Sequence, residues 1–230
     1  MQNLFNKRNN HFKEYLEFNK IEQPIINISN LVVFATNKAK ELQKEGKNIK
    51  ILELGTKRSQ TNNPTHKKNF FTHISNLEYV MTDYQYGLDV DIVCDLHKTS
   101  GVFNNNSFDI IISCSTFEHL KYPQLCGHNL MKMLNIGGII YIQTHQTYPL
   151  HGYKYDYFRF SREALKAIFS KKMNMKTIST IFNGNCVIIP EENLGGWNDV
   201  AESYLNVVYV GQKIDETPEE YIYDIDEDNL

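Results

Sequence analysis

Short apolar segments alternate with helical ones along most of the chain. Apolar runs that end in Gly, Asp or Ser are typical of buried strands. The sequence predicts seven strands, over residues 50–54, 77–83, 91–95, 108–114, 139–144, 187–189 and 205–210. Apolar positions three and four residues apart predict helices over 27–45, 121–135 and 161–170. Ser161 can cap the last of these helices, and Glu163 places an acid in its first turn.

The order of these segments predicts an α/β fold. Because apolar strands alternate with helices, we expect a mostly parallel seven-stranded sheet with helices on both faces. The last two strands predict an antiparallel edge hairpin, since little chain separates them. We expect one domain over 26–213, with an N-terminal extension over 1–25 and an acidic tail over 214–230.

Composition and charge narrow the class of protein. The 230 residues include 41% hydrophobic and 22% charged residues, and the net charge is -3, so no basic field indicates nucleic acid or an acidic membrane. None of the four cysteines forms a C-x-x-C pair, so neither a zinc site nor a redox dithiol is indicated. The N-terminus lacks the apolar core of a signal peptide. We therefore expect a cytoplasmic protein without nucleic-acid or membrane partners, and leave its oligomeric state open.

Several predicted strands end in residues suited to bind a ligand. In open α/β sheets, ligands bind at the carboxyl ends of the strands. Gly55 allows a sharp turn and a close approach of the ligand to the backbone. Asp83 can accept hydrogen bonds from two vicinal ribose hydroxyls, as such carboxylates do. Asp95 can bind an adenine amino group while Leu96 packs on the ring. Each acid could equally cap the turn that follows its strand.

Five segments resemble, in order, the motifs of the class I S-adenosylmethionine-dependent methyltransferases. They are ILELG (51–55), YVMTD (79–83), DIVCDLH (91–97), SFDIIISCSTFEHL (107–120) and LNIGGIIYIQT (134–144). Each segment alone is weak, but motifs gain weight from their context. The resemblance implies a Rossmann-like fold, S-adenosylmethionine as cofactor and transfer of its methyl group to a small acceptor.

The resemblance also assigns roles to residues. It gives Glu53 and Gly55 to the methionine end of the cofactor, and Asp83 to the ribose. It gives Asp95 and Leu96 to the adenine. Ser115, at the end of the fourth strand, falls on the floor of the cleft.

One departure from the family pattern concerns the glycine-rich turn. Gly55 is followed by Thr56-Lys57-Arg58 instead of further glycines. We hypothesise that Lys57 or Arg58 holds the methionine carboxylate. Alternatively, both cations point to solvent, which is the usual position of exposed Lys and Arg.

A second group of polar and aromatic residues follows the fifth predicted strand, over 144–160. Its end resembles an H-x-x-x-x-D-Y-x-R-F stretch of methyltransferases found among cell-surface polysaccharide biosynthesis enzymes. This implies a sugar or nucleotide-linked sugar as acceptor, with Tyr148, Tyr155 and Arg159 as binding residues. Alternatively, the aromatic residues pack the loop on the sheet, and Asp156 and Arg159 form a local ion pair.

An alcohol acceptor needs a general base. We predict His145 for this role because it leaves its strand at the cofactor edge, with His151, Tyr148 and Asp156 as substitutes. Glu118 and His119 could line the cleft or cap the helix that follows. The spacing reveals no metal cluster, although His145, His151 and Asp156 could assemble one.

Two other functions fit parts of the sequence. A nicotinamide-dependent oxidoreductase would also use Asp83 at the ribose, but the G-x-G-x-x-G turn that the pyrophosphate requires is absent. A non-catalytic module that binds the cofactor or a partner would tolerate the altered turn after Gly55.

Overall fold

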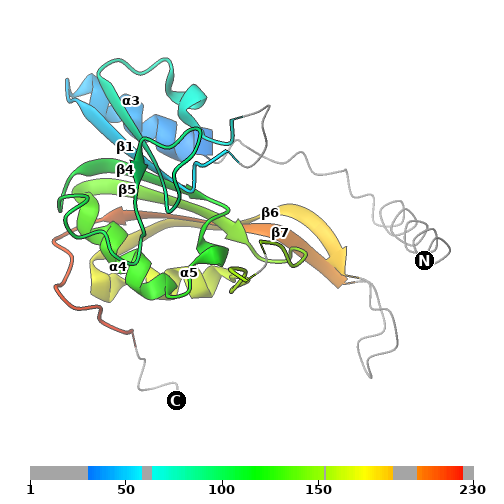
Figure 1. Cartoon of the computed structure of the whole chain (residues 1–230). Helices are drawn as coiled ribbons and strands as arrows, with labels where there is room; N and C mark the ends of the chain where they lie inside the picture. Colours follow the sequence, from blue (N-terminus) through cyan, green and yellow to red (C-terminus); the bar gives the residue numbers. More distant parts are fainter. Residues whose placement is uncertain (1–30, 59–63, 153, 189–200, 225–230) are drawn as a thin grey trace.

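The computed structural model describes residues 31–58, 64–152, 154–188 and 201–224. Within these ranges the strands form one seven-stranded sheet in the order β3-β2-β1-β4-β5-β7-β6 (Figure 1). Their bounds are β1 Ile49–Leu54, β2 Leu77–Asp83, β3 Ile92–Val93, β4 Phe108–Cys114, β5 Leu134–His145, β6 Met175–Ile188 and β7 Ala201–Lys213. The predicted α/β class is confirmed.

Strand direction creates a natural binding edge. β1 pairs in parallel with both β2 and β4, and the parallel arrangement continues to β3 and β5. β7 runs antiparallel to β5 and β6, which confirms the edge hairpin. The chain order reverses between β1 and β4, so the loops after these strands diverge and leave a crevice at their carboxyl ends.

Helices cover both faces of the sheet, as predicted (Figure 1). The π-helical turn η1 (Val32–Thr36) and α3 (Asn37–Lys44) pack on one face, and α4 (Pro123–Met133) and α5 (Arg162–Ile168) pack on the other. The described residues also form three short 3-10 helices, η2 (Lys68–Phe71), η3 (Phe117–His119) and η4 (Lys171–Met173). Ser161 caps α5 as expected, because its hydroxyl accepts from the Ala164 amide at 3.1 Å.

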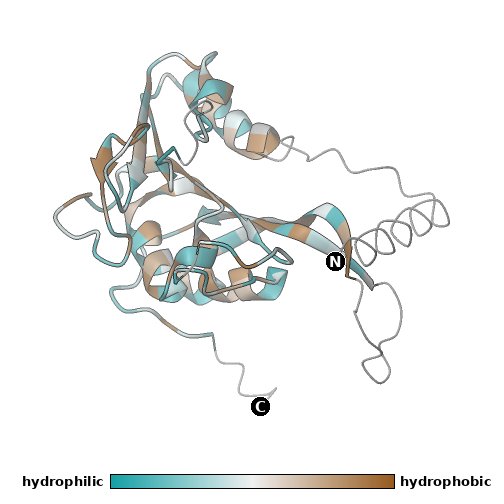
Figure 2. Ribbon diagram, turned by 45° about the vertical axis from the view of Figure 1, so that its right-hand side comes forward, coloured by the Kyte–Doolittle hydropathy of each residue, from teal (hydrophilic) through white to brown (hydrophobic). Residues whose placement is uncertain are grey.

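Strand alternation divides the core into two layers. Ile49 and Ile51 of β1 join the apolar cluster beneath α3, whereas Leu52 and Leu54 join the cluster beneath α4 and α5. Figure 2 shows teal, white and brown residues mixed along the hairpin of β6 and β7. The sheet is therefore buried on both faces at its centre, which fixes the strand ends that form the site.

Several predicted bounds are wrong. β6 begins at Met175 rather than at residue 187, and β7 is also longer than predicted. Many residues of β6 are half-buried or exposed, so it shows no continuous apolar run; its pairing with β7 holds it extended. β5 begins at Leu134, inside the predicted helix, because Leu134 pairs with Phe108 at the start of β4.

The ends of the chain are described only in part. The predicted extension over 1–25 and residues 27–30 of the predicted first helix lie outside the described residues. In the tail, the Tyr221 hydroxyl donates to the carbonyl groups of Ala167 and Ile168 at 2.8 and 3.0 Å, so this part of the tail docks on α5. Among the described helices, none has the length and hydropathy needed to cross a bilayer.

Candidate active site

A cavity of about 480 Å³ opens at the carboxyl ends of β1, β2 and β4. It lies where the strand order reverses, which is where open α/β sheets bind their ligands. Its lining combines strand ends with two loop segments, and includes Gly55, Asp83, Tyr84, Asp95, Leu96, His97, Ser115, Thr116, His119, Gly152, Tyr155 and Tyr157. Six predicted site residues therefore meet here: Gly55, Asp83, Asp95, Leu96, Ser115 and Tyr155.

Two left-handed residues shape the floor of the cavity. Gly55 has φ 69°, and a Cβ atom added there would collide with the hydroxyl of Thr116. Ser115, at the end of the neighbouring strand β4, has φ 52° and keeps its amide bonded to the Gln143 carbonyl at 2.9 Å. A non-glycine residue in this conformation is strained, and such strain concentrates at functional sites.

The two cavity acids accept hydrogen bonds from nearby loops. Asp83 accepts from the amides of Lys57 and Gln85, at 3.1 and 3.0 Å, and Asp95 accepts from the amide and ring of His97, at 3.0 and 2.7 Å. Both acids therefore cap turns. A carboxylate offers about four lone-pair sites, so each also keeps acceptor capacity for a ligand.

The structure does not bring Lys57 or Arg58 to the cavity lining. Arg58 forms a two-pronged ion pair with Asp89, at 2.7 and 2.9 Å, and this hydrogen bonding lowers the pKa of Asp89. The Lys57 ammonium donates to the Gln85 side chain at 2.6 Å. Neither cation is free to reach a carboxylate inside the cavity without giving up these partners.

Glu53 also lies behind the cavity rather than in its lining. Its carboxylate is buried and accepts from the Tyr79 hydroxyl at 2.6 Å and from the Lys67 amide at 2.8 Å. Burial raises the pKa of Glu53, and these hydrogen bonds oppose the rise. In this structure Glu53 holds the loop after β1 against the sheet.

Of the residues predicted to bind the acceptor, Tyr155 lines the cavity and two others support the loop. The Tyr148 ring stacks on His145, with centroids 4.1 Å apart. Arg159 donates to the carbonyl groups of Tyr148 and Pro149 at 3.0 Å each, and it pairs with Asp156. Hydrogen bonding from Arg159 holds the pKa of Asp156 well below its usual value, so this pair fastens the loop as an ion pair.

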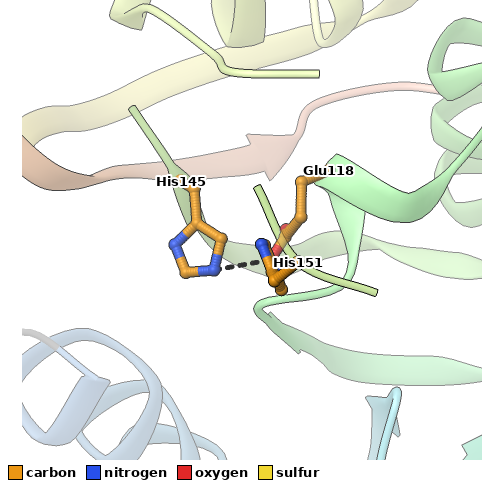
Figure 3. A group of neighbouring side chains, drawn as sticks. All are labelled: Glu118, His145 and His151. Carbon is orange, nitrogen blue, oxygen red and sulfur yellow. Dashed lines mark ion pairs between the residues drawn. The ribbon is translucent and has the colours of Figure 1, made fainter. Parts of the chain in front are cut away.

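A cluster of three histidines surrounds one buried acid beside the cavity. Glu118 is fully buried, and its Oε2 accepts from the Thr144 hydroxyl at 2.6 Å. Its Oε1 faces the Nε2 atoms of His145, His119 and His151, at 3.0, 3.9 and 4.0 Å. Figure 3 shows His145 and His151 converging on this carboxylate from the loop side.

The sequence did not settle the role of Glu118. It comes directly after β4, as part of a Glu-His pair whose second member lines the cavity. Burial raises the pKa of Glu118, but its contacts with His145 and Thr144 outweigh this and lower the pKa below its usual value. The acid is therefore an anion, and histidines from two segments gather around it.

Of the three histidines in the cluster, His119 lines the cavity and His145 does not. His145 is only 7% exposed and lies behind Glu118 and Tyr148. The Nδ1 atom of His119 is 2.9 Å from the Tyr155 carbonyl oxygen, which can only accept, so Nδ1 donates. In the neutral ring, Nε2 is then the basic nitrogen.

Sequence comparison agrees with this geometry. Residues 39–142 match the profile of a family described as a methyltransferase domain, and this span includes β1 to β4 and most of β5. Part of the chain, from within α3 to within β5, is therefore similar to a methyltransferase domain. No curated protein sequence matches the chain.

Solved structures show the same fold at low sequence identity. An S-adenosylmethionine-dependent methyltransferase from Archaeoglobus fulgidus is 11% identical, with a TM-score of 0.53 over 77% of this chain and 94% of that one. The 1,6-didemethyltoxoflavin-N1-methyltransferase of Burkholderia thailandensis is 12% identical, with a TM-score of 0.50 over 78% and 77%. The carbon methyltransferase CurJ is 16% identical over 80% of this chain, with a TM-score of 0.49; the match spans 54% of that protein.

Proposed function

We propose that this protein is a methyltransferase with S-adenosylmethionine as its cofactor. It transfers the methyl group to a hydroxyl of a small acceptor, a sugar or a nucleotide-linked sugar, in the cytoplasm and without nucleic-acid or membrane partners. The observation that supports it is a single cavity in which the strand ends meet an aromatic loop and His119. One wall suits a nucleoside, and the other suits a ring that carries hydroxyl groups.

The cofactor wall follows the roles implied by the resemblance. Asp83 serves the ribose hydroxyls, because its carboxylate lies at the end of β2 and keeps free lone pairs. Asp95 and Leu96 serve the adenine, one as acceptor and the other as a packing surface. Gly55 and Ser115 let the backbone approach the methionine end closely.

The acceptor wall is formed by the loop that precedes α5. Tyr155 and Tyr157 line the cavity and are partly exposed there, at 44% and 40%. Exposed tyrosine rings stack on sugar faces, while their hydroxyls bind sugar hydroxyls. The fold alone does not choose the acceptor, since the structurally similar proteins include a carbon and a nitrogen methyltransferase. The sugar assignment therefore rests on this loop.

Methyl transfer is an in-line displacement. Bound S-adenosylmethionine would supply an activated methyl group to the acceptor oxygen, and S-adenosylhomocysteine would be the leaving group. The enzyme aligns oxygen, methyl and sulfur and excludes water. The hydroxyl proton passes to Nε2 of His119, which the Tyr155 carbonyl orients through Nδ1 at 2.9 Å. We assign the base to His119 rather than to His145, because only His119 lines the cavity.

Two measurements test this proposal. Calorimetric titration with S-adenosylhomocysteine is expected to show binding, whereas NADH is expected to show none. The protein is then incubated with S-adenosylmethionine and a panel of sugars and sugar nucleotides, and products are detected by mass spectrometry as the gain of one methyl group. Binding of the cofactor product without methylation of any member of the panel would favour the non-catalytic function. Binding of NADH instead would contradict the proposal.

A further inference from the structure

The three histidines of the cluster share one hydrogen-bonding pattern. Each Nδ1 atom lies near an oxygen that can only accept: the Tyr155 carbonyl at 2.9 Å for His119, the Asn206 side chain at 2.9 Å for His145, and the Pro149 carbonyl at 3.1 Å for His151. Each Nδ1 therefore donates. In a neutral ring, this leaves an unprotonated Nε2, and all three Nε2 atoms face Oε1 of Glu118.

The acceptor at the centre of these atoms lacks a donor. Oε1 of Glu118 is buried and has no formed hydrogen bond among the described residues, although Nε2 of His145 lies 3.0 Å away; Oε2 is bonded to Thr144. A buried carboxylate oxygen that faces nitrogen lone pairs is unfavourable unless something positive lies between them. The three histidines, with one nitrogen donating outward and the other directed inward, have the arrangement that metal-ligating histidines adopt.

We propose that Glu118, His145 and His151 bind one divalent transition-metal cation through Oε1 and the two Nε2 atoms. These donor atoms lie within 4.8 Å of one another (Figure 3). A tetrahedral cation with ligands at about 2.0–2.1 Å holds them about 3.3 Å apart, so small side-chain rotations close the site. Thr144 and Asn206 hold the ligands from behind.

The donor set selects the class of cation. Two imidazoles and one carboxylate suit Zn²⁺ and its transition-metal neighbours, and this set leaves a coordination position open. Mg²⁺ and Ca²⁺ prefer oxygen ligands only. The cavity lining includes His119 but none of the three proposed ligands. Because Nε2 of His119 lies 3.9 Å from Oε1 of Glu118, a bound cation would fix Glu118 and thereby help to position the proposed base. That role rests on the proposed function, whereas cation binding does not.

Calorimetric titration of the full chain, without a histidine tag and after chelator treatment, tests the site directly. Zn²⁺ is expected to bind with one equivalent per chain, and Mg²⁺ is expected not to bind. Glu118→Gln and His151→Ala are each expected to weaken Zn²⁺ binding at least about 100-fold, since even outer-shell changes cost about 10–100-fold. Glu118→Gln preserves shape, and His151 lies in a half-exposed loop, so both variants should fold.

His73→Ala is the matched control, because His73 is exposed and lies outside the cluster. It should bind Zn²⁺ as the wild type does. S-adenosylhomocysteine affinity, measured on every variant, reports the fold and the cofactor site separately. Retained S-adenosylhomocysteine binding with no Zn²⁺ binding by the wild type would overturn the metal site and leave the proposed function standing. Equal Zn²⁺ affinity in the wild type and Glu118→Gln would also overturn it, and a proton shared by His145 and Glu118 would then explain the cluster.

Discussion

The two walls of the cavity are held in place by different kinds of contact. On the cofactor wall, the hydrogen bonds of the parallel ladder set the ends of β1, β2 and β4, with Leu54 in register with Thr82 and Ser113. On the acceptor wall, the loop before α5 is held by single contacts, such as the amides of Tyr157 and Phe158 that share the Glu118 carbonyl.

This difference predicts how each wall responds to mutation. A strand end is fixed by many backbone bonds, so a side chain there can be changed with mainly local loss of ligand contacts. The loop depends on the Asp156–Arg159 pair and on the histidine cluster, so its residues affect both position and chemistry. Changes on the cofactor wall should therefore alter affinity, and changes on the acceptor wall should alter turnover.

The largest effect is expected at His119. His119→Ala removes the proposed base and should lower kcat about 10²–10⁴-fold, the usual contribution of general acid–base catalysis. S-adenosylhomocysteine affinity should change little. The matched control is His97→Ala, because His97 lines the same cavity on the cofactor side. Steady-state kinetics and calorimetry measure the two quantities. If kcat falls in His145→Ala and not in His119→Ala, the base is His145, as the sequence first indicated.

Gly55→Ala should destabilise the protein next most strongly. The new Cβ combines a left-handed backbone with a collision against Thr116, so the free energy of unfolding should fall by about 2–4 kcal/mol. Gly101→Ala provides the control, because Gly101 has φ 80° and no atom near the added Cβ. It should lose only about 1–2 kcal/mol from backbone strain. Denaturant unfolding compares them, and equal losses would show that the contact with Thr116 is unimportant.

Asp83→Ala should weaken S-adenosylhomocysteine binding roughly 10- to 100-fold, because hydrogen bonds to a charged group contribute about 1.5–3 kcal/mol. Asp109→Ala is the matched control: Asp109 also caps a backbone amide, that of Lys50 at 2.9 Å, but at the opposite edge of the sheet. It should lose stability and keep affinity. Equal affinity in Asp83→Ala and the wild type, measured by calorimetry, would contradict the proposed contact between Asp83 and the ribose.

The smallest effect is expected from the two cations after Gly55. Arg58 is engaged with Asp89 and Lys57 with Gln85, so Arg58→Ala and Lys57→Ala should leave S-adenosylhomocysteine affinity unchanged. The cost to stability should stay below about 1 kcal/mol, as is usual for ion pairs near the surface. A clear loss of affinity in either variant would restore the hypothesis that these cations hold the methionine carboxylate.

The fold and the position of four cavity residues were predictable from the sequence. Buried parallel strands carry continuous apolar runs, and the residue that ends each run lies at the binding edge, so Gly55, Asp83, Asp95 and Ser115 were all predicted to lie where the cavity now is. Strand bounds were less predictable for β6, because its half-exposed residues are held extended by β7 rather than by their own pattern.

The other side chains of the site come together only through tertiary contacts between distant segments. Glu118 lies between His145 and Thr144 because β4 and β5 are neighbours in the sheet, although 26 residues separate Glu118 from Thr144. The loop then folds back so that His151 completes the cluster and Tyr155 reaches the cavity. Lys57 and Arg58 turn to partners that come from the loop after β2. Such side-chain contacts depend on loop closure and burial, which periodicity does not encode.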